Sequence, residues 1–271
     1  MPLFVLPFPT IDPVLIELGP IVIRWYALAY IAGLLFAWWY IKRLIRNDDL
    51  WAKGPRPKPE HIDDLMFWIV LGVIFGGRLG YVLVYDPAYF LANPGAILAV
   101  WQGGMSFHGG AAGVILAVIG YGWRHKVSIL SLLDLAAAAV PVGLFLGRLA
   151  NFIRGELFGR VSDVPWAMVF PAGGPQPRHP SQLYEAALEG IVLFAVLWVL
   201  THRAKMLKTP GLIGAIFMIG YGTARIIVEF FRMPDAQIGF LAGGATMGMV
   251  LSVPMILIGM ILAIMVVRRP A

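Results

Sequence analysis

Residues 132–160 read LLDLAAAAVPVGLFLGRLANFIRGELFGR, an apolar run that passes directly into a polar one. The apolar part has the character of a membrane-spanning helix, because a bilayer core about 30 Å thick is crossed by about 20 apolar residues. The polar part brings Arg148, Asn151, Arg154, Glu156 and Arg160 close together along the chain. This junction predicts a membrane protein with a polar site near one end of a spanning helix.

The composition of the whole chain supports this prediction. Of its 271 residues, 59% are hydrophobic and 13% are charged, and the mean hydropathy is +0.80, which excludes an ordinary soluble globular protein. We expect an all-α integral membrane protein that forms one polytopic domain over residues 1–271. Seven apolar windows are candidate transmembrane helices: 21–41, 65–84, 107–122, 129–150, 183–200, 211–229 and 246–267.

Two absences narrow the expected chemistry. The first twenty residues contain no Lys or Arg and no small-residue cleavage site, so we do not expect a cleavable secretory signal. The chain has no cysteine, so neither a disulfide, a thiolate metal site nor a cysteine nucleophile of its own is expected. The sequence implies neither a metal nor a cofactor.

The distribution of basic residues predicts the topology. The formal net charge is +6, and Lys and Arg cluster after the first, third, fifth and seventh windows. By the positive-inside rule these ends are cytoplasmic, so we expect the N-terminus outside and the C-terminus inside. The charge therefore indicates topology, and no nucleic-acid partner is expected. The clusters consist of Lys42, Arg43, Arg46, Lys53, Arg56, Lys58, Arg124, Lys126, Arg203, Lys205, Lys208, Arg268 and Arg269.

The remaining basic residues are all arginines. A guanidinium group suits bidentate pairing with phosphate or carboxylate in partly desolvated places, so we expect the chemistry on the outer side of the membrane. These residues are Arg24, Arg78, Arg148, Arg154, Arg160, Arg178, Arg225 and Arg232.

Two outer segments separate the windows. Residues 85–108 contain Asp-Pro and Asn-Pro turn signals around a short apolar piece, which predicts an interfacial or re-entrant arm. Residues 155–180 are rich in Pro and Gly and predict a small head, with WAMVF at 166–170 as a candidate strand. The segments GGRLGYVL at 76–83 and LGRLANFI at 146–153 are alike, which indicates either an internal duplication or two similar helix ends.

Polar residues with helical spacing mark two of the windows. Arg148 and Asn151 are three residues apart and share a helix face, and the same polarity continues beyond the helix end. A second stripe has spacings of four, four and three residues. An internal ion pair between Arg225 and Glu229 is the structural alternative to a binding role. The second stripe consists of Tyr221, Arg225, Glu229 and Arg232.

Other residues at the predicted outer helix ends complete a candidate site. Tyr26 opens the first window and His108 the third, although an interfacial anchor and a structural histidine are equally ordinary interpretations. In RHPSQLYEA, Ser181 or His179 is a candidate N-cap, with Glu185 in the first turn, and this segment has a wholly structural interpretation as well. Together these groups predict a site for an anionic amphipathic molecule, most naturally a phospholipid head group.

The stretch GRLANFIRGELFGR resembles the signature of the prolipoprotein diacylglyceryl transferase family. Arg154 departs from the usual Asn of that signature, and Ala27 replaces a more familiar Gly. Further resemblance runs through RWYALAY, GGRLGYVLVY, MSFHGG, RHPSQLYEA and YGTARIIVEFFRMPD. The signature positions that fit are Gly147, Arg148, Ala150, Asn151, Phe152, Ile153, Glu156 and Gly159.

The resemblance implies a bacterial inner-membrane enzyme with its active site toward the periplasm. Such an enzyme moves the diacylglyceryl group of phosphatidylglycerol to the lipobox cysteine of a prolipoprotein signal peptide, forming a thioether and releasing glycerol phosphate. Its partners are these two substrates and the surrounding membrane lipids. The resemblance assigns function to Tyr26, His108, Arg148, Asn151, Glu156, Gly159, Tyr221, Arg225 and Glu229.

Residue chemistry suggests roles for several of these positions. His108 is a candidate base for the substrate thiol, and Arg148 with Arg225 is a candidate clamp for the departing phosphate. Tyr26 and Asn151 are candidate catalytic hydrogen-bonding groups. Candidate substrate-binding residues are Arg148, Asn151, Glu156, Gly159, Tyr221, Arg225, Glu229, Arg78 and Arg232. The alternatives are a transporter or flippase for an anionic phospholipid, and a structural scaffold of the envelope.

Overall fold

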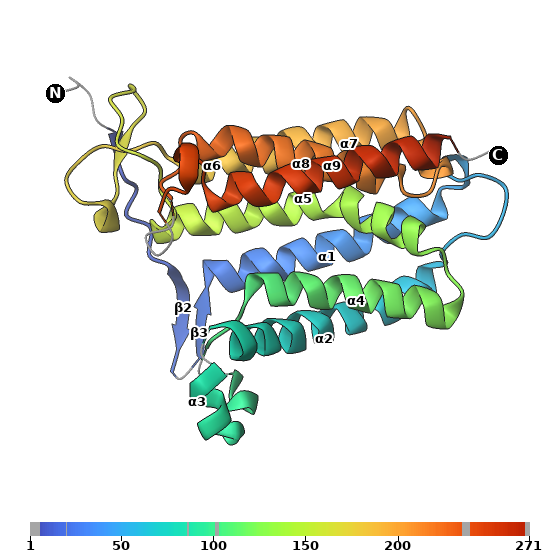
Figure 1. Cartoon of the computed structure of the whole chain (residues 1–271), viewed down its shortest axis with the longest axis horizontal. Helices are drawn as coiled ribbons and strands as arrows, with labels where there is room; N and C mark the ends of the chain where they lie inside the picture. Colours follow the sequence, from blue (N-terminus) through green and yellow to red (C-terminus); the bar gives the residue numbers. More distant parts are fainter. Residues whose placement is uncertain (1–5, 20, 86, 101–102, 235–238, 269–271) are drawn as a thin grey trace. The chain divides into compact units, whose positions relative to one another are not determined.

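The computed structural model describes residues 6–19, 21–85, 87–100, 103–234 and 239–268. The fold is predominantly helical, as expected (Figure 1). Within these residues, six helices are long and apolar enough to cross a membrane, which makes the chain a multi-pass membrane protein. They are α1 (Trp25–Arg46), α2 (Pro59–Val84), α5 (Ile129–Arg154), the helix Ser181–His202, α8 (Leu212–Glu229) and α9 (Met247–Val267).

Two of the seven predicted windows differ from these helices. The window 107–122 corresponds to α4 (Phe107–His125), which is helical but is not among the six, so its crossing stays a prediction. The window 21–41 begins too early, because residues Ile21–Arg24 form strand β3 and α1 starts only at Trp25. The β-branched residues Ile21, Val22 and Ile23 favour an extended backbone, which overrides their apolar character.

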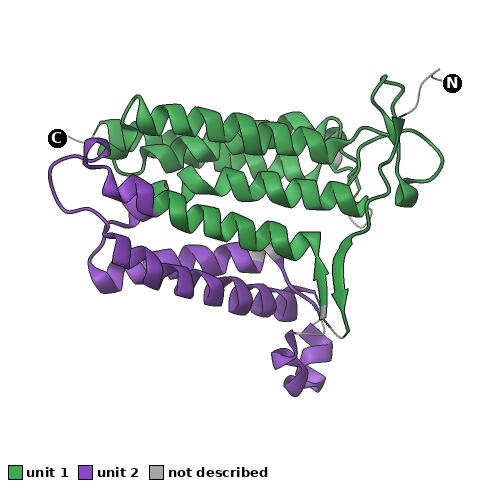
Figure 2. Ribbon diagram, turned by 180° about the vertical axis from the view of Figure 1, so that it is seen from behind, with its two compact units in different colours: residues 1–41, 134–271 green, residues 42–133 purple. Residues whose placement is uncertain are grey.

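The chain divides into two compact units, residues 1–41 with 134–271 and residues 42–133 (Figure 2). Unit 2 contains η1 (Asp48–Leu50), α2, the short helices α3 (Pro87–Ala92) and η2 (Pro94–Leu98), and α4. Its two long helices pack through glycines: a Cβ atom added to Gly76 would lie 3.0 Å from Cα of Gly113, and one added to Gly80 would lie 2.8 Å from Cα of Gly109. Small residues at this spacing allow helix backbones to touch.

Unit 1 contains the other long helices, which run alongside one another in Figure 1. A Cβ atom added to Gly33 of α1 would lie 3.0 Å from Cα of Gly143 of α5, so these helices also meet through glycines. Gly143 therefore serves close helix packing. Gly147 lies in open space instead, because a Cβ atom added there would meet no other described atom within 4 Å.

One helix of unit 1 is interrupted in its hydrogen bonding. It begins as α6 (Ser181–Glu185), continues as a seven-residue π-helix, η5 (Ala186–Val192), and resumes as α7 (Leu193–His202). The predicted N-cap by Ser181 or His179 is wrong, because Pro180 occupies that position and makes no side-chain cap. Instead, the hydroxyl of Ser181 donates to the carbonyl of Leu157 at 3.0 Å. This hydrogen bond connects the N-terminal end of the helix to the head, residues 155–180.

The extended segments of unit 1 are short. Strands β2 (Val14–Leu18) and β3 (Ile21–Arg24) form an antiparallel pair. Strand β4 (Met168–Val169) lies inside the predicted WAMVF strand and pairs in parallel with β1 (Leu6–Pro7). Next to β4, the ring of Phe170 is fully buried. Its centroid lies 5.1, 6.2 and 5.4 Å from the ring centroids of Phe8, Phe152 and Phe158. This aromatic core holds residues 155–180 against the end of α5.

The N-terminal end of α8 is held by a buried carboxylate. Asp134 of α5 accepts hydrogen bonds from the backbone N–H groups of Gly211 and Gly214, at 2.6 and 2.7 Å. These N–H groups belong to the first turn of α8 and have no partner within the helix. Asp134 therefore fixes the start of α8 against α5, which sets the depth of the polar stripe farther along α8.

Candidate functional site

A cluster of six charged side chains joins three helices of unit 1, and we call it the arginine-glutamate cluster. It contains three arginines and three glutamates, so its formal charges balance. The side chains come from α5, from the helix Ser181–His202 and from the C-terminal end of α8. The members are Arg148, Glu185, Glu189, Arg225, Glu229 and Arg232.

Glu185 lies at the centre of the cluster and is fully buried. Its carboxylate lies 3.2 Å from Nε of Arg148 and 2.8 Å from Nη1 of Arg232, and it also pairs with Nη1 of Arg225. One carboxylate therefore connects arginines from two different helices. A buried charge of this kind is tolerated in a membrane only when it is paired, which these three contacts achieve.

Glu189 is also fully buried and lies one turn further along the same helix. Its Oε2 atom accepts a hydrogen bond from Nη2 of Arg148 at 3.2 Å, and its Oε1 atom lies 3.9 Å from Nη1 of Arg225. Glu185 and Glu189 thus hold the same two arginines between them. The side chains of Arg148 and Arg225 are mostly buried but keep 17% and 15% exposure.

Glu229 completes the cluster from α8 itself. Its Oε1 atom pairs with Nη2 of Arg225, four residues earlier, and lies 3.9 Å from Nε of Arg232. Gly248 in the first turn of α9 makes room for this carboxylate, because an added Cβ would lie 2.7 Å from Cδ of Glu229. A small pocket of about 20 Å³ opens here, lined by Arg225, Glu229, Arg232, Pro234, Gly239, Thr246, Met247 and Gly248.

The ion pair between Arg225 and Glu229 expected from the sequence is therefore present, but it is one contact of a larger network. Tyr221 lies one turn before Arg225 on the same helix, and its ring stacks on that of Phe217 with centroids 5.8 Å apart. The structure brings four of the predicted residues, Arg148, Arg225, Glu229 and Arg232, into one connected set.

A second polar group forms where α5 ends. Asn151 donates from Nδ2 to Oε1 of Glu156 at 2.9 Å, and Nε of Arg154 lies 3.1 Å from the other oxygen of the same carboxylate. Arg154, which departs from the family signature, thus pairs with Glu156, the same residue that Asn151 binds. Tyr26 is near enough to Glu156 for electrostatic interaction, and its hydroxyl shares a 2.9 Å hydrogen bond with that of Tyr30.

Gly159 and Arg160 connect the head to the end of α8. The N–H of Gly159 donates to the carbonyl of His179 at 2.8 Å, and an added Cβ would lie only 2.6 Å from the Phe231 carbonyl oxygen. Arg160 donates to the carbonyls of Glu229 and Arg232 at 2.9 and 3.0 Å. These are among the last carbonyls of α8, so Arg160 acts as a C-terminal cap for this helix.

His179 packs beside this connection. Its Nδ1 atom lies 3.0 Å from the hydroxyl of Tyr184, and its ring contacts those of Tyr184 and Phe231. Burial among these rings lowers the pKa of His179 below its usual value, because burial disfavours the charged imidazolium. The neutral histidine is therefore the form that fits the folded head.

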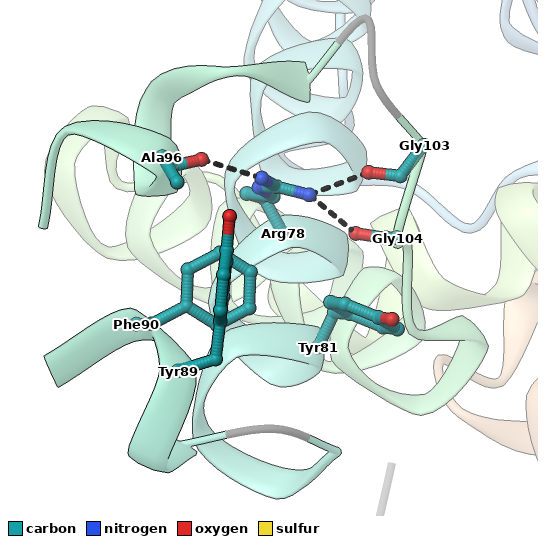
Figure 3. Close-up of a pocket in the computed structure, with 7 residues that line it drawn as sticks. All are labelled: Arg78, Tyr81, Tyr89, Phe90, Ala96, Gly103 and Gly104. Atoms are coloured by element: carbon teal, nitrogen blue, oxygen red, sulfur yellow. Dashed lines mark hydrogen bonds between the residues drawn. The ribbon is translucent and has the colours of Figure 1, made fainter. Parts of the chain in front are cut away.

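Arg78 of α2 lies in unit 2 and has a different environment (Figure 3). Its guanidinium group donates to four main-chain carbonyls, those of Ala96, Ile97, Gly103 and Gly104. It also lies over the ring of Phe90, 5.2 Å from the centroid. A pocket of about 200 Å³ adjoins it, lined by Arg78, Tyr81, Tyr89, Phe90, Ala96, Gly103 and Gly104. These contacts hold the segment after α3 in place and offer no support for head-group binding by Arg78.

His108 lies in the first turn of α4, but its side chain is outside the described part of the structure. The helix start itself is defined, because Ser106 caps it by accepting from the N–H of Gly109 at 3.2 Å. The role of His108 as a base stays a prediction. Among the described residues, no group of three or more His, Asp or Glu has the arrangement of a metal site.

Glu189 is the residue that the sequence interpretation missed. Glu185 was considered only for its position in a first helical turn. The signal that identifies both is the same one that singled out Arg225: an ionisable residue inside an apolar helix requires a partner. In YEAALEG the two glutamates are four residues apart, so they share one helix face.

Comparison with known proteins identifies relatives of this chain. The sequence matches the profile of the prolipoprotein diacylglyceryl transferase family over residues 13–265. It is also similar to proteins named phosphatidylglycerol--prolipoprotein diacylglyceryl transferase from Brucella anthropi, Brucella canis and Brucella ovis. Each is 57% identical over 262 residues, which cover 96% of this chain and 93% of the relative.

Proposed function

This chain belongs to the prolipoprotein diacylglyceryl transferase family, and from that premise we propose how its arginines act on a phospholipid. The enzyme transfers the diacylglyceryl group of phosphatidylglycerol to the cysteine thiol of a prolipoprotein. A carbon–sulfur bond forms, and the bond between the same glyceryl carbon and the phosphate oxygen breaks. The product is a thioether, and glycerol phosphate leaves with the electron pair of the broken bond.

Arg148 and Arg225 form the clamp for the phosphate. The observation that carries this proposal is that two buried carboxylates hold both guanidinium groups together while each arginine side chain keeps some exposed surface. Within the described residues, Nη1 of Arg148 and Nε of Arg225 donate no hydrogen bond, so donors are available for phosphate oxygens. Negative charge grows on the phosphate as the bond breaks, and preorganised donors stabilise that charge.

The remaining candidate residues have supporting roles in this proposal. Asn151, Tyr26 and Glu156 bind or orient the lipid head group near the end of α5, and Tyr221, Glu229 and Arg232 support the clamp from α8. Gly159 contributes by allowing the head to approach α8. His108 takes the thiol proton, because a cysteine of pKa about 8.5 is mostly protonated near neutrality. The site faces the periplasm in the inner membrane, consistent with the clustering of basic residues at the other helix ends.

Turnover by purified enzyme tests the clamp. The assay combines phosphatidylglycerol vesicles with a lipobox peptide and detects the peptide by mass, and the wild type should add one diacylglyceryl group to the cysteine. Arg148→Lys and Arg225→Lys should each lower kcat roughly 100-fold or more, because lysine keeps the charge but loses the planar fork. Arg56→Lys, at an exposed pair with Asp48, is the matched control. Unchanged rates in the first two variants would contradict the clamp, and lipid movement without an adduct would indicate a flippase.

A further inference from the structure

Glu189 lies on a helix that departs from α-helical geometry where it meets the clamp. The π-helical segment Ala186–Val192 begins directly after Glu185 and contains Glu189. A π-helix has more residues per turn than an α-helix, so side chains four apart come closer to one line along its surface. π-helical turns are rare and are frequent at functional sites. The segment presents Glu185 and Glu189 together to the arginines of α5 and α8.

Gly190 brings this segment close to α5. A Cβ atom added there would lie 2.6 Å from Cβ and 3.0 Å from Cα of Phe145, so only glycine permits the observed approach. Phe145 lies one turn before Arg148 on α5. The close approach at Gly190 therefore places the carboxylate of the neighbouring Glu189 at the depth of the Arg148 guanidinium.

The contacts of Glu189 are unequal. It accepts a 3.2 Å hydrogen bond from Nη2 of Arg148, whereas its Oε1 atom makes no hydrogen bond and lies 3.9 Å from Nη1 of Arg225. Glu185 differs because it also binds Arg232 and so supports the end of α8. Glu189 contacts only the two arginines of the clamp among the described ion pairs. It is fully buried and no lipid group needs to touch it.

We propose that Glu189 is a positioning residue, which orients the guanidinium group of Arg148 toward the phosphate that Arg225 also binds. The proposal rests on the proposed function and concerns the geometry of its clamp. With Glu189 in place, Nη2 of Arg148 is engaged by one carboxylate while Nε is held by another, that of Glu185. Loss of the Glu189 contact leaves Arg148 charged but held only at Nε, so its guanidinium group is less firmly oriented, and small misplacements of a reacting pair lower the rate strongly.

Glu189→Gln tests the proposal because it separates charge from geometry. Glutamine has nearly the same size, but it leaves three arginines against two carboxylates, so the site becomes more attractive to an anionic head group. We expect KM for phosphatidylglycerol to fall, while kcat per folded molecule falls on the order of tenfold to 100-fold. A purely structural role would lower the folded fraction and leave both constants of the folded enzyme unchanged. Glu17→Gln, at an exposed position of β2, is the matched control.

Two further variants decide the outcome if Glu189→Gln does not fold. Glu189→Asp keeps the charge and withdraws it by one methylene, so kcat should fall with KM unchanged. The pair Arg148→Lys and Glu189→Asp should combine with less than additive loss of kcat, because both act on one contact. Unchanged kcat and KM in a folded Glu189 variant overturn the positioning role alone. Failure of the wild type to form the adduct contradicts the proposed function instead.

Discussion

Arg78 and Arg148 occupy equivalent places in two similar stretches of sequence, yet their partners differ. The segments GGRLGYVL and LGRLANFI both place an arginine directly after glycine. Within the described residues, Arg78 donates its hydrogen bonds to main-chain carbonyls, whereas Arg148 pairs with the carboxylates of Glu185 and Glu189. Neutral carbonyls satisfy a guanidinium group and build structure. Carboxylates balance its charge as well, which allows an arginine to stay charged, oriented and partly exposed inside a membrane protein.

The largest effect should come from removing the charge of Arg148. Arg148→Met leaves Glu185 and Glu189 buried with one cation fewer, and breaking a buried ion pair costs about 3–5 kcal/mol. We expect a large fall in Tm in detergent together with loss of turnover. Combining it with Glu189→Gln should restore much of the Tm, because the charges balance again, but none of the turnover. A double variant no more stable than the single one would contradict this account of the cluster.

Arg78→Met should have a smaller effect of a different kind. It leaves up to four carbonyls without a donor, and an unsatisfied buried polar group costs about 1–3 kcal/mol. Water can reach part of this region, so we expect the lower half of that range in total, measured as a decrease in Tm. Turnover per folded molecule should stay within a few-fold of wild type. Loss of lipid binding in a well-folded Arg78→Met enzyme would instead assign Arg78 to substrate binding.

Asp134 extends the comparison to a buried acid with main-chain partners. Like Arg78, it satisfies its charge with backbone groups, here the N–H groups of Gly211 and Gly214. Asp134→Asn keeps one acceptor oxygen and loses the charge, so unfolding free energy should fall by about 1–2 kcal/mol. KM should be unchanged, because the cluster lies at the other end of α8. Thermal unfolding and kinetics on the same preparation check both statements.

The smallest effect concerns pH and the head. Burial lowers the pKa of His179 in the folded chain. As the pH falls, the imidazole therefore takes up a proton near pH 6.5 in the unfolded chain, and only at a lower pH in the folded chain. Stability should therefore be unaffected above about pH 6.5 and should fall as the pH drops through that value. His179→Gln should flatten this slope between pH 7 and 5 in thermal unfolding. Arginine side chains do not titrate in this range. A slope that is unchanged in His179→Gln would therefore mean that other titratable groups cause the pH dependence of stability.

Much of the helical framework could be predicted from the sequence, because apolar length and charge placement are local properties. Six predicted windows coincide with spanning helices, most with ends within a few residues. The first window fails at its start, where β-branched residues form β3, and the N-cap at Ser181 fails because that hydroxyl binds the head. The first error arises from local strand propensity and pairing with the adjacent strand β2, and the second from a contact with a distant part of the chain. Apolar periodicity reports neither.

The candidate site, like the helical framework, could be predicted from the sequence only in part. The stripe on α8 and the polar end of α5 follow from spacing alone, and so does the identification of Arg148 and Arg225. Their shared partners on the helix Ser181–His202 do not, because Glu189 reaches Arg148 only through the close approach that Gly190 allows. Arg160 was one of the arginines expected on the outer side, and the structure gives it the carbonyls of Glu229 and Arg232 at and just beyond the end of α8.

The sequence by itself determined that this chain is a membrane protein with arginines at its helix ends, because burying charge in an apolar helix is costly wherever that helix lies. Only the tertiary structure decided what each arginine binds. A guanidinium group has five donors and accepts any nearby oxygen as a partner, so its role depends on which carbonyl or carboxylate the packing of other helices brings within about 3 Å.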